Sequence, residues 1–227
     1  MKIIGVLAPG GPASVIKNIN HGADPKMLLW REGFVVSRLL SALLIDSEIV
    51  ITALVVERTP SSRPPKIRTK GWHKARKLTE PPIKRQRIAS YAIVKSHAGV
   101  LGSKCSNLTA IPGLWQLPGG GLEPGETPAA CLMREINEET SQEVSLGRLI
   151  DIQSEHRLGK GPSGQLEDFQ AIRIIYTATC PNPTKPVVLD VGGTTSAARW
   201  IPLYRWRTFR WTGGARSLLE SHLAHVP

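Results

Sequence analysis

Cysteine is scarce in this sequence, with only Cys105, Cys131 and Cys180 in 227 residues. The number is odd, and no two of them form a C-x-x-C pair. This pattern excludes a small disulfide scaffold and a thiolate zinc site, and it favours a reducing compartment.

Long hydrophobic runs are also missing. The most apolar region, residues 33–56, is interrupted by Arg38, Asp46 and Glu48. No run approaches the roughly 20 apolar residues that span a bilayer. The apolar stretch near the amino terminus is too short for the core of a secretory signal peptide. We therefore expect a soluble, cytoplasmic protein without a membrane partner.

Acidic residues are in the minority, because 18 Asp and Glu oppose 29 Lys and Arg and leave a net charge of +11. The excess is concentrated in residues 57–87, which hold eleven basic and two acidic side chains and five prolines. Prolines disfavour a continuous helix or a central strand, so we interpret residues 57–87 as a basic, Pro-rich linker. The alternative is a nucleic-acid-binding arm in which Trp72 stacks on a base.

The two remaining parts of the chain differ in their sequence patterns. Residues 1–56 carry no motif; residues 48–56 predict a buried strand, and residues 34–45 are compatible with a helix or a strand. We treat this part as an N-terminal extension of unknown structure. Residues 88–227 predict a single α/β domain with helices after Thr127 and over 214–225, because short apolar runs alternate there with Gly- and Pro-rich connections. Its strands are expected at residues 87–94, 99–105, 114–118, 144–152, 169–180, 187–191 and 198–203.

The helix after Thr127 should begin at Pro128, because Thr is a favourable N-cap and Pro suits the first helical position. An apolar stripe, expected to face the sheet, is formed at helical spacing by Ala129, Leu132, Met133 and Ile136.

Three carboxylates follow on the same helix. Glu135, Glu138 and Glu139 have helical spacings of three and four residues, which brings Cβ atoms within about 5–6 Å. Such a cluster repels itself unless divalent cations neutralise it, and Mg²⁺ binds carboxylate oxygens together with substrate phosphates. The alternative is a solvated helix face on which Arg134 simply pairs with Glu138.

A glycine-rich loop precedes this helix. Gly119, Gly120 and Gly121 allow the backbone to approach a ligand closely. Glu126 lies eight residues before Arg134, and we expect the two side chains to brace the loop against the helix and so support the metal ligands.

Together these residues resemble the Nudix box, G-x5-E-x7-R-E-U-x-E-E-x-G-U, in which U is a bulky aliphatic residue. The match runs through Gly120, Glu126, Arg134, Glu135, Ile136, Glu138 and Glu139. Two positions depart from the pattern: Ser141 replaces the glycine and Gln142 replaces the aliphatic residue. A non-glycine residue in a left-handed conformation lowers stability by about 1 kcal/mol. The two departures therefore affect how the helix ends, and they leave the expected metal ligands unchanged.

The resemblance implies a Nudix-type α/β/α sandwich with a mixed sheet, and hydrolysis of a pyrophosphate bond in a nucleoside diphosphate linked to another moiety. It also implies Mg²⁺ or Mn²⁺ held by Glu135, Glu138 and Glu139, a nucleotide substrate bordered by the glycine loop, and in many relatives a homodimer.

A general base is expected among these carboxylates or in a later loop, where Glu167 is the preferred candidate over Glu155, His156 and Asp168. Two other functions stay open: a nucleotide-sensing regulator, and an RNA-end processing protein that binds nucleic acid through residues 57–87.

Overall fold

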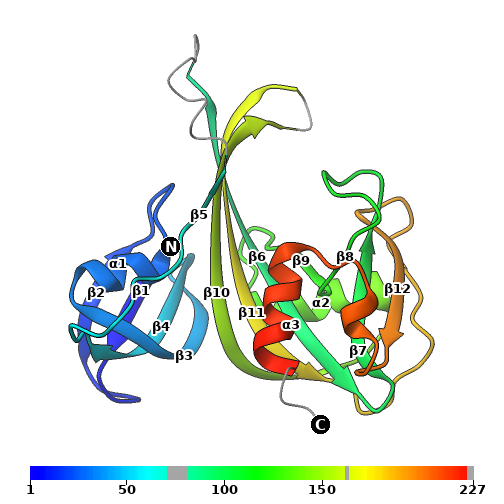
Figure 1. Ribbon diagram of the computed structural model, residues 1–227, viewed down its shortest axis with the longest axis horizontal. Coiled ribbons are helices and arrows are strands. Elements are labelled where there is room, and N and C mark those ends of the chain that lie inside the picture. Colours follow the sequence, from blue (N-terminus) through cyan, green and yellow to red (C-terminus); the bar gives the residue numbers. More distant parts are fainter. Residues whose placement is uncertain (71–80, 162–163, 224–227) are drawn as a thin grey trace. The chain divides into compact units, whose positions relative to one another are not determined.

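The computed structural model describes residues 1–70, 81–161 and 164–223, in which the strands form two sheets (Figure 1). The chain divides into two compact units. The first comprises residues 1–89, 121–128 and 149–175, and the second comprises residues 90–120, 129–148 and 176–227. Trp72, which was expected to stack on a base, lies outside the described residues.

The N-terminal part of the first unit folds into a four-stranded sheet of order β2-β1-β4-β3 with one short helix. Its elements are β1 (Lys2–Val6), β2 (Ala13–Asn18), α1 (Pro25–Arg31), β3 (Phe34–Ile45) and β4 (Glu48–Glu57). Residues 34–45, for which helix and strand were both open, form a strand that pairs antiparallel with β4. The predicted strand over residues 48–56 is confirmed.

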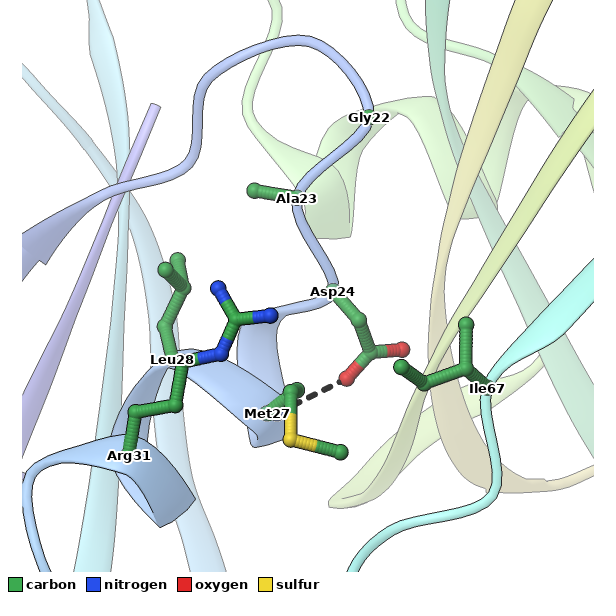
Figure 2. Close-up of a pocket in the computed structure, with 7 residues that line it drawn as sticks. All are labelled: Gly22, Ala23, Asp24, Met27, Leu28, Arg31 and Ile67. Atoms are coloured by element: carbon green, nitrogen blue, oxygen red, sulfur yellow. Dashed lines mark hydrogen bonds between the residues drawn. The ribbon is translucent and has the colours of Figure 1, made fainter.

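Local sequence explains two features of this part. Asp46 and Ser47 connect β3 to β4 with φ values of 47° and 62°, the left-handed conformation that tight hairpin turns require. Asp24 caps α1, because its carboxylate accepts a hydrogen bond of 2.9 Å from the Met27 amide (Figure 2). Pro25 occupies the first helical position, where no amide hydrogen is needed.

The second sheet is mixed. Six of its strands follow the order β12-β7-β6-β11-β10-β5, with β8 beside β7 and β9 beside β6; β5 is parallel to β10, whereas β12 is antiparallel to β7. Together with its helices, this sheet confirms the predicted α/β/α class. The strands are β5 (Arg68–Lys70), β6 (Ile83–Ser96), β7 (Gly99–Cys105), β8 (Trp115–Gln116), β9 (Gly119–Gly121), β10 (Ser145–Lys160), β11 (Leu166–Thr179) and β12 (Thr195–Ile201).

Two differences from the predicted strands have physical causes. Strand β6 begins at Ile83, inside the expected linker. Proline disfavours the interior of a strand, but Pro81 and Pro82 stand just before its first residue and therefore leave its hydrogen bonds intact. Residues 187–191 do not form the predicted strand. Instead, the amides of Val187 and Leu189 donate hydrogen bonds to the carbonyls of Thr140 and Glu138, at the end of the helix that begins after the glycine strand.

That helix is α2 (Pro128–Thr140), and it begins where predicted. Its buried stripe differs from the prediction, because Met133 is 39% exposed whereas Cys131, Leu132 and Ile136 are buried. The fold continues to a short 3₁₀ turn, η2 (Trp206–Thr208), and to the helix α3 (Gly213–Leu223). No helix in the described part of the chain is long and apolar enough to cross a bilayer.

The two positions that depart from the box pattern are accommodated at the end of α2. Ser141 adopts the left-handed conformation, with a φ of 54°, and its Oγ accepts a hydrogen bond of 3.2 Å from the Val187 amide. Gln142 is buried but satisfied, because it both donates to the Thr184 side chain and accepts from the Thr184 amide, each at 2.9 Å.

Candidate functional site

The candidate site lies in the second unit, where α2 packs beside the glycine strand β9. The Gly119 amide donates a hydrogen bond of 3.1 Å to Glu139 Oε2. A Cβ atom on Gly120 would lie 2.3 Å from Glu135 Oε1. Gly119 itself has a φ of 134°, and a Cβ there would lie 2.1 Å from the Ser90 carbonyl oxygen. Gly120 therefore allows the backbone to lie against the Glu135 carboxylate, and Gly119 allows β9 to pack closely on the backbone of β6.

Glu139 is the most constrained of these carboxylates, with only 5% of its surface exposed. Oε2 accepts hydrogen bonds from Ser103 Oγ at 2.9 Å and from the Gly119 amide, and Oε1 accepts one from Thr195 Oγ1. Burial, with a smaller contribution from the charge of Glu135, raises the pKa of Glu139 to about 7 against the opposing effect of these three hydrogen bonds. The carboxylate is fixed in place, and its raised pKa indicates that the three hydrogen bonds offset only part of the cost of burying its charge.

Arg134 supplies positive charge to the other two carboxylates. Its Nη1 atom lies 3.2 Å from Glu135 Oε1 and 3.1 Å from Glu138 Oε2. The predicted Arg134–Glu138 pair therefore exists. It does not make the helix face merely solvated, because Glu135 lies against β9 and Glu139 is buried in the core.

Glu126 closes the turn that precedes the helix. Its Oε2 atom accepts a hydrogen bond of 3.0 Å from the Glu123 amide, and Gly125 in the same turn has a φ of 77°. The expected bracing between Glu126 and Arg134 stays a prediction. Gly121 leaves room for Arg87, since a Cβ there would lie 2.8 Å from Arg87 Nε.

The residues present fit a divalent cation. Carboxylate oxygens are the donors that Mg²⁺ and Mn²⁺ prefer, and α2 presents three of them on one side of the helix. The raised pKa of Glu139 gives a structural reason for a cation, because nearby positive charge would favour the ionised form that burial and Glu135 disfavour.

Glu167 belongs to β11 and to the first compact unit. It is 3% exposed, and its Oε1 atom accepts a hydrogen bond of 2.9 Å from Arg85 Nη1. A Cβ atom on Gly161 would lie 2.3 Å from the Glu167 carboxyl carbon. The carboxylate is thus held by an ion pair on one side and by the backbone on the other, and its role as a base stays a prediction.

The other candidates of this region have partners of their own. Glu155 pairs with Arg173 at 3.4 Å. His156 Nε2 lies 2.5 Å from Asp168 Oδ1, and His21 Nε2 approaches the same oxygen at 3.0 Å. We call these three residues the histidine–aspartate cluster. His21 had not been foreseen, because it stands in a part of the chain without a motif.

The chain is similar to several known proteins. A family model described as the NUDIX domain matches residues 85–220. The chain is 32% identical over 101 residues to nucleoside triphosphatase NudI of Enterobacter sp. (strain 638), which covers 43% of this chain and 72% of the relative. It is 35% identical over 68 residues to an 8-oxo-dGTP diphosphatase of Proteus vulgaris, which covers 30% of this chain and 61% of the relative. A solved NUDIX hydrolase from Nitrosomonas europaea is 19% identical with a TM-score of 0.47, over 62% of this chain and 90% of that chain.

Proposed function

This chain belongs to the Nudix hydrolase family and hydrolyses a pyrophosphate bond in a nucleotide-linked substrate, and we propose that Glu135, Glu138 and Glu139 carry the reaction. One observation supports the assignment above all others: the glycine strand and the carboxylate helix are in contact, through the Gly119 amide on Glu139 and through Gly120 against Glu135.

Nudix hydrolases generally use divalent metal ions, and we assign Mg²⁺ or Mn²⁺ in this chain to Glu135, Glu138 and Glu139. When bound, such an ion polarises a phosphoryl group and lowers the pKa of a bound water. Arg134 limits the repulsion between Glu135 and Glu138 by its contacts with both, so these side chains are held ready for their ligands.

Glu139 is oriented by its three hydrogen-bond donors and needs little reorganisation during the reaction. With a pKa of about 7, its carboxyl group is only partly ionised near neutral pH, and a cation held beside it would favour the ionised form. We propose that the strand Gly119–Gly121 also borders the substrate phosphates, because a backbone without Cβ atoms permits their close approach.

Two carboxylates are candidates for the general base. Glu139 lies against the glycine strand and is oriented by three hydrogen bonds, whereas Glu167 is ion-paired with Arg85. A pH–rate profile separates them. If Glu167 is the base, Glu167→Gln removes the acidic limb of the profile and leaves metal affinity unchanged. If Glu139 is the base, Glu167→Gln keeps the shape of that limb.

The function is tested with a panel of nucleoside triphosphates, including 8-oxo-dGTP, and dinucleotide-like diphosphates such as ADP-ribose. Purified protein with Mg²⁺ should release orthophosphate, pyrophosphate or a nucleoside monophosphate from at least one of them. Glu139→Gln should lower kcat at least about 100-fold while circular dichroism stays unchanged. Glu143→Gln, which changes an exposed glutamate three residues after the end of α2, is the matched control. Undiminished turnover in Glu139→Gln would reject the site assignment.

A second candidate function, RNA-end processing, has support from one feature of the basic tract. The first five residues of β6, from Ile83 to Arg87, are all exposed, and three of them are Lys84, Arg85 and Arg87. An exposed basic strand suits contacts to a phosphate backbone. The regulator alternative is less well supported, because the chain retains all three carboxylates of the box.

A further inference from the structure

The histidine–aspartate cluster brings together three segments of the first unit. His21 lies in the loop between β2 and α1, His156 lies on β10, and Asp168 lies on β11. One nitrogen of each imidazole and one carboxylate oxygen all lie within 4.8 Å of one another. Residues from three separate parts of the chain therefore converge on one small volume.

The cluster is largely shielded from water. The side chains of His21, His156 and Asp168 are 22%, 15% and 9% exposed. The two imidazole rings meet edge to face, with centroids 5.3 Å apart. His21 Nε2 is buried and lies 3.0 Å from Asp168 Oδ1, the oxygen that His156 Nε2 also approaches. One carboxylate oxygen is therefore shared between two imidazole nitrogens.

The loop that carries His21 is held in place by Gln170, which is buried on β11. Gln170 Oε1 accepts a hydrogen bond of 2.7 Å from the Gly22 amide, and Gln170 Nε2 donates one of 2.7 Å to the Ala23 carbonyl. Gly22 has a φ of 83°, and a Cβ there would lie 2.9 Å from His156 Cε1. Figure 2 shows Gly22, Ala23 and Asp24 following one another along this loop. Backbone conformation and a buried amide thus both fix the position of His21.

We propose that His21, His156 and Asp168 bind a divalent transition-metal ion of the zinc class. Two imidazoles and a carboxylate are a donor set that suits zinc and its neighbours, whereas Mg²⁺ prefers oxygen alone. Ligand atoms at about 2.0–2.2 Å from a tetrahedral ion are about 3.3–3.6 Å apart. The contacts of 2.5 and 3.0 Å to Asp168 Oδ1 therefore need to widen by roughly 1 Å or less.

This site differs from the carboxylate site in both chemistry and place. It uses nitrogen donors, and it joins the N-terminal sheet to β10 and β11, since His21 lies 135 residues before His156. A bound ion would cross-link segments that are far apart in the sequence, so its binding free energy would stabilise the folded first unit. Three protein ligands leave a fourth position for water.

The test uses the full-length protein freed of metal by a chelator and then saturated with Mg²⁺, which occupies oxygen-only sites. Titration with Co²⁺ should give one equivalent of visible ligand-field absorption, and Zn²⁺ should displace it and raise Tm. His21→Ala and His156→Ala should each weaken Zn²⁺ binding by more than about 100-fold. His97→Ala, which removes an exposed histidine of the β6–β7 turn, should bind Zn²⁺ as the unmodified chain does.

Asp168→Asn keeps the size of the side chain, and it addresses the case in which a histidine variant fails to fold. This variant should fold without metal but lose most of the Zn²⁺-dependent rise in Tm. The proposal is overturned if the unmodified protein takes up no Co²⁺ or Zn²⁺ in the presence of Mg²⁺, which would leave the cluster a hydrogen-bond network only. It is equally overturned if His21→Ala and Asp168→Asn bind Zn²⁺ as tightly as the unmodified chain. Neither outcome bears on nucleotide hydrolysis, which is measured with Mg²⁺ alone.

Discussion

Ser103 on β7 donates a hydrogen bond of 2.9 Å to Glu139 on α2, so a carboxylate of this helix is anchored inside the core of its unit. Such a carboxylate would be costly to bury without partners. Thr195 on β12 donates to its other oxygen. The helix is thereby held on the sheet through the same side chain that we assign to the metal.

The pH dependence of stability follows from Glu139. Its folded pKa of about 7 lies above the ordinary value of 4.5, so its contribution to stability is fully present below pH 4.5 and is lost as pH rises through 7. The loss is about 3 kcal/mol at most. We expect metal-free protein to have a lower free energy of unfolding in urea at pH 8 than at pH 5.5. Glu139→Gln should flatten this difference, and an equally steep decline in the variant would contradict the assignment.

Gly120→Ala tests the contact between β9 and α2. The new Cβ would lie 2.3 to 2.5 Å from the Glu135 carboxylate, which is the end of a flexible side chain and can move. We expect the free energy of unfolding to change by about 1 kcal/mol or less and kcat with Mg²⁺ to fall at least about 10-fold. Gly159→Ala is the control, because nothing lies within 4 Å of its added Cβ. Full activity in Gly120→Ala would show that Glu135 is dispensable there.

Ser141 allows backbone strain to be separated from a side-chain hydrogen bond. Both Ser141→Gly and Ser141→Ala remove the Oγ that accepts from the Val187 amide, but only glycine relieves the φ of 54°. We expect the glycine variant to be about 1 kcal/mol more stable than the alanine variant, as measured by urea unfolding. Equal stabilities would show that the left-handed conformation costs nothing at this position.

Charge removal in the basic tract tests the nucleic-acid alternative without deleting β5 or β6. Lys66 and Lys84 are both exposed. If they contact phosphates of single-stranded RNA, Lys66→Gln with Lys84→Gln should reduce the slope of log K against log salt by about 1.4, or about 0.7 per contact. Lys185→Gln, at an exposed position outside the tract, should leave the slope unchanged. Weak binding that does not depend on salt would leave the tract without a role in RNA binding.

The box residues and the start of α2 could be predicted because their information is local. A helix cap, a first-turn proline and fixed spacings are all readable from consecutive residues. The buried stripe could be predicted only in part. It includes Glu139, three positions after Ile136, and a sequence pattern assigns a charged residue to the solvent side unless its partners are known.

The hydrogen-bond partners of Glu139 could not be predicted from the sequence. Ser103 and Thr195 stand 36 and 56 residues from Glu139 and belong to different strands, and alternation along a strand does not say which helix it faces. His21 was missed for the same reason, because its two neighbours lie more than a hundred residues further along the chain.

The cysteines that were scarce in the sequence are all enclosed in the fold, none more than 2% exposed. Burial also raises the thiol pKa of Cys105 and Cys180, so little reactive thiolate forms at neutral pH. A cysteine introduced on the surface would therefore react with a maleimide dye well before the native cysteines. The fluorescence of that dye would then report nucleotide binding in a chain that keeps its native cysteines.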